Sequence, residues 1–103
     1  MKRILSILAL LLLTCSAMSQ NTIKGVLYDD ANGEAIPFAN VVLDGTGYGA
    51  ATDLNGLFIM NKIPDGKYTI RVRYVGYEEY RETVTLSKHQ TLKVNIKLKP
   101  SAA

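Results

Sequence analysis

The chain has 103 residues, one cysteine and a net charge of +3, which falls to +1 if the two positive charges of Lys2 and Arg3 are removed with an export signal. This length allows one small domain, and a single cysteine allows no disulfide within it. Because the remaining chain is almost neutral and has no run of basic residues, we expect no nucleic-acid partner.

Residues 1–19 have the pattern of a secretory signal peptide. Lys2 and Arg3 give a positive start, and residues 4–13 form an apolar stretch interrupted only by Ser6. In a helix, that stretch would reach about half-way across the ~30 Å hydrocarbon core of a membrane. We therefore expect an exported protein that lies in the periplasm or is associated with the outer membrane, without a transmembrane span in the mature chain.

The end of this segment is compatible with two kinds of processing. Small residues at positions 17 and 19 fit the −3 and −1 sites of a signal peptidase, which would leave Gln20 as the mature N-terminus. The alternative is a lipoprotein signal, in which Cys15 would carry a lipid anchor. Thr14 fits the position before such a cysteine poorly, so cleavage before Gln20 is the favoured interpretation.

The rest of the chain reads as seven strands with turn residues between them. Their predicted ranges are 22–28, 38–43, 48–52, 57–63, 68–74, 79–86 and 91–98. Seven short strands at this spacing, with no helix pattern among them, predict an all-β sandwich or barrel. We assign residues 20–99 to this domain and residues 100–103 to the start of a linker or tail.

Residues 52–77 have the clearest strand and turn pattern. Turn residues at 53–56 and 64–66 enclose an apolar run, and residues 68–74 then alternate strictly between apolar and polar. We therefore predict that the strands 57–63 and 68–74 form a hairpin. Glycines at 45, 47 and 49 predict a bulge or a tight corner around the short third strand.

The last strand alternates aliphatic residues with lysine and asparagine. Lysines at 93 and 97 fall on its polar face, as is common where a strand lies at the edge of a sheet. We predict that residues 91–98 lie near such an edge. The predicted core consists of Ile23, Val41, Leu43, Phe58, Met60, Tyr68, Ile70, Val72, Tyr74, Val84, Leu86, Leu92, Val94, Ile96 and Leu98.

One set of turn and strand residues resembles the carboxypeptidase regulatory-like domain. The matching positions are Gly25, Val26, Asp29, Gly33, Pro37, Ala39, Val41, Thr52, Asp53, Gly56, Phe58, Pro64, Gly66, Tyr68, Gly76 and Tyr77. The resemblance implies a seven-stranded, transthyretin-like (prealbumin-like) Greek-key β-sandwich, and it implies structural roles for these motif residues.

In Bacteroidetes-type relatives, the resemblance implies a domain between the signal peptide and the TonB box and plug of a TonB-dependent outer-membrane receptor. Residues 98–103 resemble the join that leads into the TonB box. These 103 residues contain no TonB box, plug or barrel strands, and no peptidase domain. Neither receptor transport nor peptidase activity is therefore carried over.

The predicted domain has little that points to catalysis. His89 is its only histidine, and it lies in a polar turn without an obvious partner, so we expect a solvated turn residue there. Aspartate and asparagine near Asp29 and Asp53 resemble half a calcium loop, but the downstream glutamate of an EF-hand is absent. We predict no catalytic residue, no cofactor and no metal site, and we expect that the chain is not an enzyme.

Tyrosines and arginines are the remaining candidates for ligand contact. Arg71, Arg73 and Tyr80 are the residues we single out, because rings stack on sugars and guanidinium groups bind polar ligands. The alternative is that the arginines form a solvated sheet face and that the tyrosines at 68 and 74 belong to the core.

The sequence leads to three functional hypotheses. The leading one is a non-catalytic, exported module that binds a protein partner at the periplasmic side of the outer membrane through an edge strand or a loop. The alternatives are a small carbohydrate-binding module with a glycan ligand, and an accessory folding domain of a peptidase. Two or more tyrosines on one exposed face would favour glycan binding, and a sheet edge without proline or bulges would favour strand addition.

Overall fold

The computed structural model describes residues 20–101, so the predicted signal peptide and Cys15 lie outside the described residues. Seven strands are present: β1 (Gln20–Asp29), β2 (Asn40–Leu43), β3 (Gly49–Ala51), β4 (Leu57–Pro64), β5 (Gly66–Val72), β6 (Tyr80–Leu86) and β7 (Thr91–Leu98). All seven predicted strands are found, and their ends differ from the prediction by at most two residues.

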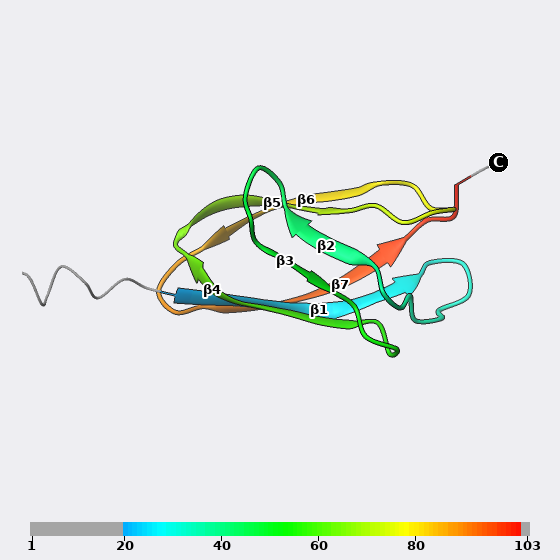
Figure 1. Cartoon of the computed structure of the whole chain (residues 1–103), viewed down its shortest axis with the longest axis horizontal. Coiled ribbons are helices and arrows are strands. Elements are labelled where there is room, and N and C mark those ends of the chain that lie inside the picture. Colours follow the sequence, from blue (N-terminus) through cyan, green and yellow to red (C-terminus); the bar gives the residue numbers. More distant parts are fainter. Residues whose placement is uncertain (1–19, 102–103) are drawn as a thin grey trace, which may run out of the picture.

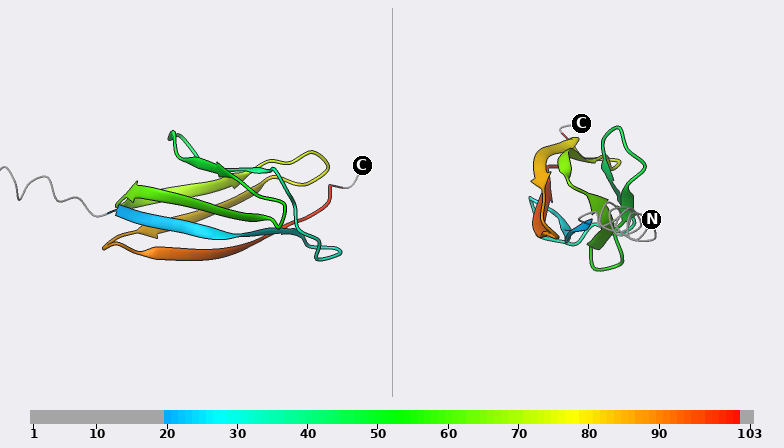
Figure 2. Two further views of the ribbon diagram at one scale, coloured as in Figure 1. Left: turned by 60° about the horizontal axis from the view of Figure 1, so that its bottom comes forward. Right: turned by 90° about the vertical axis from the view of Figure 1, so that its left-hand side faces the viewer.

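The strands form two sheets, which face each other as the layers of a β-sandwich (Figures 1 and 2). One sheet has the strand order β4-β1-β7, with β1 antiparallel to β4 and parallel to β7. The other has the order β3-β2-β5-β6, and all its pairs are antiparallel. The predicted all-β sandwich is therefore confirmed, and β7 lies at a sheet edge as the lysine pattern predicted.

The predicted hairpin between the fourth and fifth strands is wrong. β4 pairs with β1, whereas β5 pairs with β2 and β6 in the opposite sheet. Only Asp65 separates the two strands, and the Tyr68 hydroxyl donates to the Pro64 carbonyl across this corner at 2.7 Å. Turn residues mark a change of chain direction, but they do not decide whether the flanking strands pair or pass to different sheets.

A β-bulge interrupts β4 close to this corner. The register with β1 shifts between Asn21 and Ile23, and Lys62 has a positive φ of 59°. An extra residue in one strand reverses the alternation beyond it. Met60 and Ile63 are therefore both buried, although a regular strand would place them on opposite faces.

Fourteen apolar side chains are buried between the sheets. They are Ile23, Leu27, Ile36, Ala39, Val41, Leu43, Phe58, Met60, Ile63, Ile70, Val72, Leu86, Ile96 and Leu98. All lie between residues 23 and 98, so a chain of residues 20–103 contains the whole described core and is the form used in the experiments below.

The predicted core needs a correction in two directions. Five predicted members are only half-buried, and these are Tyr68, Tyr74, Val84, Leu92 and Val94. Three of the five belong to the edge strands β6 and β7, where no further strand covers the margin of the core. Four buried residues were not predicted, and these are Leu27, Ile36, Ala39 and Ile63.

Candidate functional site: the edge of β7

Residues 20–101 contain no group of three histidine, cysteine, aspartate or glutamate side chains placed to hold a metal ion. This part of the chain contains no helix that is long and apolar enough to cross a membrane. His89 is exposed in the turn between β6 and β7, where it has a positive φ of 53°. The structure therefore gives His89 the surroundings of a solvated turn residue.

The Asp53 turn is held by the aspartate itself. Asp53 Oδ1 accepts hydrogen bonds from the backbone N–H of Asn55 at 2.8 Å and of Leu57 at 3.0 Å. Gly56 has a φ of +76°, and a Cβ there would lie 2.4 Å from the Leu27 carbonyl oxygen. This segment is a turn built around a carboxylate acceptor, which explains the aspartate and glycine of the motif without an ion.

Asp29 closes the turn after β1 and is tied to a distant loop. Its Oδ1 accepts from the N–H of Ala31 at 2.6 Å and of Asn32 at 3.2 Å, and its Oδ2 accepts from the Tyr77 hydroxyl at 2.6 Å. The tyrosine hydrogen bond is the largest cause of a lowered pKa of Asp29, and the same bond raises the pKa of Tyr77. Gly76 precedes this tyrosine with a φ of +89°.

The other motif residues also have structural surroundings. Gly25 lies in β1, where a Cβ would be only 1.9 Å from the Val94 carbonyl oxygen of β7. Phe58 is buried, and Gly66 begins β5 against the ring of Tyr68. Pro37 is half-buried in the link from β1 to β2. None of these residues projects a polar group toward a shared pocket.

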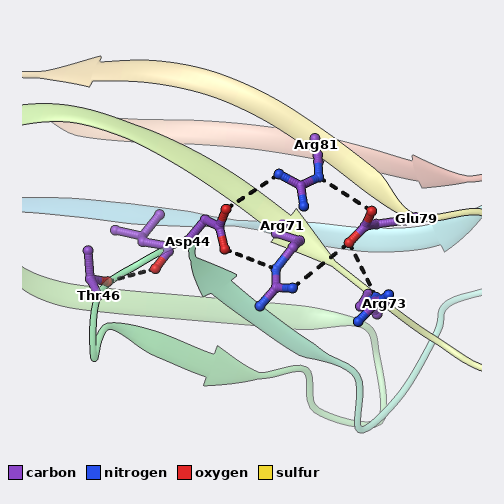
Figure 3. A network of polar contacts seen from close by, with 7 residues as sticks. Asp44, Thr46, Arg71, Arg73, Glu79 and Arg81 are labelled. Carbon is purple, nitrogen blue, oxygen red and sulfur yellow. Dashed lines mark hydrogen bonds and ion pairs between the residues drawn. The ribbon is translucent and has the colours of Figure 1, made fainter.

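Arg71 and Arg73, which the sequence suggested for ligand contact, belong to an ion-pair network on the outer face of the β3-β2-β5-β6 sheet (Figure 3). Arg71 Nε lies 3.4 Å from Asp44 Oδ1, in an arrangement that makes an ion pair without a hydrogen bond. Arg73 Nε lies 3.3 Å from Glu79 Oε1. Arg81 contacts both carboxylates, at 3.4 Å and 3.3 Å. These arginines are already matched to carboxylates of the same chain.

Tyr80 is not part of that network. It precedes Arg81 in β6, so its side chain points to the opposite face of the strand. The Tyr80 hydroxyl donates to Glu82, and burial together with this hydrogen bond raises the pKa of Tyr80 well above its ordinary value. The structure thus brings Arg71 and Arg73 together and leaves Tyr80 on the other side of the sheet.

The outer edge of β7 has a regular row of free main-chain positions. The N–H of Thr22 donates to the carbonyl of Gln90, and the N–H of Asp30 donates to that of Leu98. In a parallel ladder the bonded residues alternate, so even-numbered β7 residues face β1. The N–H and C=O groups of Lys93, Asn95 and Lys97 consequently point away from the sheet.

The opposite edge of the same sheet is blocked. The Leu57 carbonyl accepts from the N–H of Asp53 at 2.9 Å, and the Leu57 N–H donates to the Asp53 carboxylate. Farther along β4, the Lys62 bulge and Pro64 interrupt the edge. β3, at one edge of the other sheet, has only three residues. β7 therefore presents a longer and more regular edge than β3 or β4.

A family model matches residues 23–103, and it is described as the CarboxypepD_reg-like domain. The chain belongs to this family. The expected resemblance is thereby confirmed, and it covers nearly all of the described sandwich. A search of curated proteins found no match.

Solved structures show that the CarboxypepD_reg-like domain shares its fold with proteins that are described in different ways. A chain of the type II cohesin–X-dockerin complex from Acetivibrio cellulolyticus has a TM-score of 0.65 at 20% identity, and the match covers 78% of this chain and 58% of that one. A proposed carbohydrate-binding protein from Pseudomonas aeruginosa has a TM-score of 0.60 at 19% identity, with coverages of 78% and 89%. One from Bacteroides uniformis has a TM-score of 0.58 at 17% identity, with coverages of 78% and 41%.

These similarities are similarities of fold. The CarboxypepD_reg-like domain spans little more than half of the cohesin–X-dockerin chain that it matches. Sequence reasoning found the edge position of β7 from its lysines, but it did not find which edge is blocked. The blocking by Asp53 and by the Lys62 bulge depends on pairings that only the folded chain shows.

Proposed function

We propose that this chain is an exported, non-catalytic β-sandwich that binds a protein partner at the periplasmic side of the outer membrane by strand addition along β7. The observation that carries the proposal is the open row of main-chain groups at Lys93, Asn95 and Lys97. Such an edge gives a peptide strand its hydrogen bonds, while alternate side chains provide selectivity. The export signal pattern and the resemblance to the N-terminal extension of TonB-dependent receptors support the location.

The edge of β6 is the competing edge, and its charged side chains argue against it. Arg81 is paired with two carboxylates, and Glu82 accepts from the Tyr80 hydroxyl. The lysines of β7 form no ion pair with any carboxylate among residues 20–101. β7 therefore has both free main-chain groups and unmatched charges.

A site-specific crosslinking experiment tests the proposal. Residues 20–103 contain no cysteine, so a Thr91→Cys variant can carry one photocrosslinker at the exposed start of β7. The labelled domain is mixed with envelope extract, irradiated and examined for adducts by mass spectrometry. We expect an adduct from Thr91→Cys and none from a Thr83→Cys control on β6, whose side chain is also exposed.

A second substitution at Asn95 tests strand addition itself. Asn95→Pro removes an N–H that points away from β1, whereas Asn95→Ala keeps it, so the ladder to β1 remains intact in both. Combined with Thr91→Cys, the proline variant should lose the adduct and the alanine variant should keep it. Adducts of equal yield in both variants, with circular dichroism showing both to be folded, would contradict strand addition at β7.

Carbohydrate binding is the second candidate, and one specific observation favours it. Tyr74 and Tyr77 lie with their ring centroids 5.8 Å apart beside a hollow of about 450 Å³, which Arg73 and Glu79 also line. The rings are tilted by 39°, and the Tyr77 hydroxyl is already bound to Asp29. A Tyr74→Ala variant that loses binding on a glycan array, while Tyr48→Ala keeps it, would support this candidate.

A further inference from the structure

The outer face of β7 carries positive charge without a matching carboxylate. Lys24 of β1 lies directly beside Lys93 of β7 in the parallel register. Like charges at such positions repel each other. All five ion pairs found in residues 20–101 use arginine, so neither lysine is neutralised by a carboxylate there. A carboxylate brought to this edge by a partner would relieve the repulsion.

Lys97 marks the far end of the same positive row. Its Nζ lies 5.9 Å from the centroid of the Tyr28 ring, which is its neighbour across the β1–β7 ladder. The Lys97 side chain is exposed, so its ammonium group can be reached by an anion from solvent. Lys93 and Lys97 are four residues apart, about 13 Å along a strand. They therefore fit two carboxylates with the same spacing on an added strand.

The inner face of β7 is apolar and incompletely covered. Ile96 and Leu98 are at most 1% exposed, whereas Leu92 and Val94, on the same face, are only half-buried. Val84 of the neighbouring edge strand β6 is half-buried as well. Aliphatic side chains on the inner face of an added strand would extend the core over this margin.

We propose that the partner segment is an extended strand with the order acidic, aliphatic, any residue, aliphatic, acidic. This inference rests on the proposed strand addition and specifies its partner. The two acidic side chains face Lys93 and Lys97, and the two aliphatic side chains between them lie opposite the half-buried Val94 and the buried Ile96. A second copy of this chain does not fit, because pairing of two β7 strands would bring lysines to both sides of the new contact.

Peptide titrations followed by the ¹H–¹⁵N spectrum of residues 20–103 test this inference. The probes are the peptide TEVTVET and its charge-reversed form TKVTVKT, both blocked at their ends. Each cross-strand charge pair stabilises or destabilises modestly, so reversal of two pairs should weaken binding about tenfold. The double variant Lys93→Glu/Lys97→Glu should reverse the preference. Lys62→Glu/Lys67→Glu, with the same change in net charge away from β7, should keep it.

The outcomes separate this inference from the proposed function. Tighter binding of the acidic peptide, its reversal by the β7 charge swap and its loss in Asn95→Pro would support the inference. Equal binding of both peptides, with loss of both in Asn95→Pro, would overturn the acidic specificity and leave strand addition standing. Binding of neither peptide, together with a specific adduct at Thr91→Cys, would overturn the partner chemistry alone, and absence of that adduct as well would overturn the proposed function.

Discussion

The Tyr77 hydroxyl donates a hydrogen bond of 2.6 Å to Asp29 Oδ2, and the two residues are 48 positions apart in the chain. Asp29 is only 6% exposed and ends β1, whereas Tyr77 belongs to the loop between β5 and β6. The bond therefore joins the two sheets at one end of the sandwich. A bridge between Tyr77 and Pro100 attaches the end of the described chain to the same place.

Tyr77→Phe should lower the free energy of unfolding at neutral pH and make it change less with pH in the acid range. The hydroxyl is the main cause that holds the pKa of Asp29 below its ordinary value of 3.8. The unfolded state thus takes up the proton first, and the stabilisation is present above pH 4 and lost as the pH falls through the lowered pKa. Urea unfolding between pH 2 and 7 measures this, and a variant with an unchanged acid slope would contradict it.

Because the pKa of Tyr77 is raised, the stability that Tyr77 contributes falls as the pH rises at alkaline pH, the opposite direction to the effect of Asp29. Its contribution is present below its ordinary pKa of 10.0 and is lost as the pH rises through the higher folded value. Tyr28→Phe is a matched control, because it also removes one tyrosine hydroxyl from a half-buried ring. In urea unfolding between pH 2 and 7, Tyr28→Phe should show the same change of stability with pH as the unchanged domain.

Gly25→Ala should destabilise the domain strongly. An added Cβ would lie 1.9 Å from the Val94 carbonyl oxygen, which belongs to the backbone and can move only if β1 and β7 separate. Overpacking of this kind costs about 1–3 kcal/mol, and occasionally more. Urea denaturation measures the loss, and Gly47→Ala is the control, since a Cβ there meets nothing within 4 Å. Equal stability of the two variants would show that the strands can separate without cost.

The sequence predicted the sandwich well because its strands have strong local signals. Alternation identified Ile70 and Val72 in β5 and Ile96 in β7, and these residues are buried as predicted. Ile36 escaped prediction because it lies in the irregular link between β1 and β2, where no period applies, whereas Ala39 shares the alternation of Val41 and Leu43 in the predicted strand 38–43 but was not among the predicted core residues. Ile63 escaped it because the Lys62 bulge shifts the alternation.

The candidate site could be predicted only in part. The lysines of β7 indicated an edge, but no local pattern tells that Asp53 blocks the edge of β4. The ion pairs of the arginine network could not be predicted from local sequence patterns either. Asp44 follows β2 and Glu79 precedes β6, so their contacts with Arg71 exist only after β2, β5 and β6 have assembled.

Asp44→Asn should cost a small, salt-dependent amount of stability. Arg71 and Arg81 are direct neighbours across the β5–β6 ladder, and Asp44 contacts both at 3.4 Å. The side chain of Asp44 is 39% exposed, so we expect a loss of only about 0.5–1 kcal/mol. The loss should shrink in 1 M salt, where the screening length is about 3 Å.

Asp30→Asn is the control for this charge effect. Asp30 is exposed and forms no ion pair with the other residues of the described part of the chain. The control should change the urea midpoint little at either salt concentration. A loss for Asp44→Asn that stays the same in 1 M salt would mean that Asp44 acts through hydrogen bonding and not through its charge.

Thr52→Val should be among the most damaging conservative substitutions. Thr52 is 2% exposed, and its hydroxyl donates to the Ile36 carbonyl at 2.7 Å and accepts from the Ala39 N–H at 2.9 Å. Valine keeps the shape but leaves two buried main-chain groups unpaired, at a cost of about 1–3 kcal/mol each. Thr52→Ser keeps the hydroxyl and loses only a methyl group, which costs about 1 kcal/mol. Urea denaturation should therefore rank serine well above valine, and the reverse order would mean that packing, and not the hydroxyl, holds the link between β1 and β2.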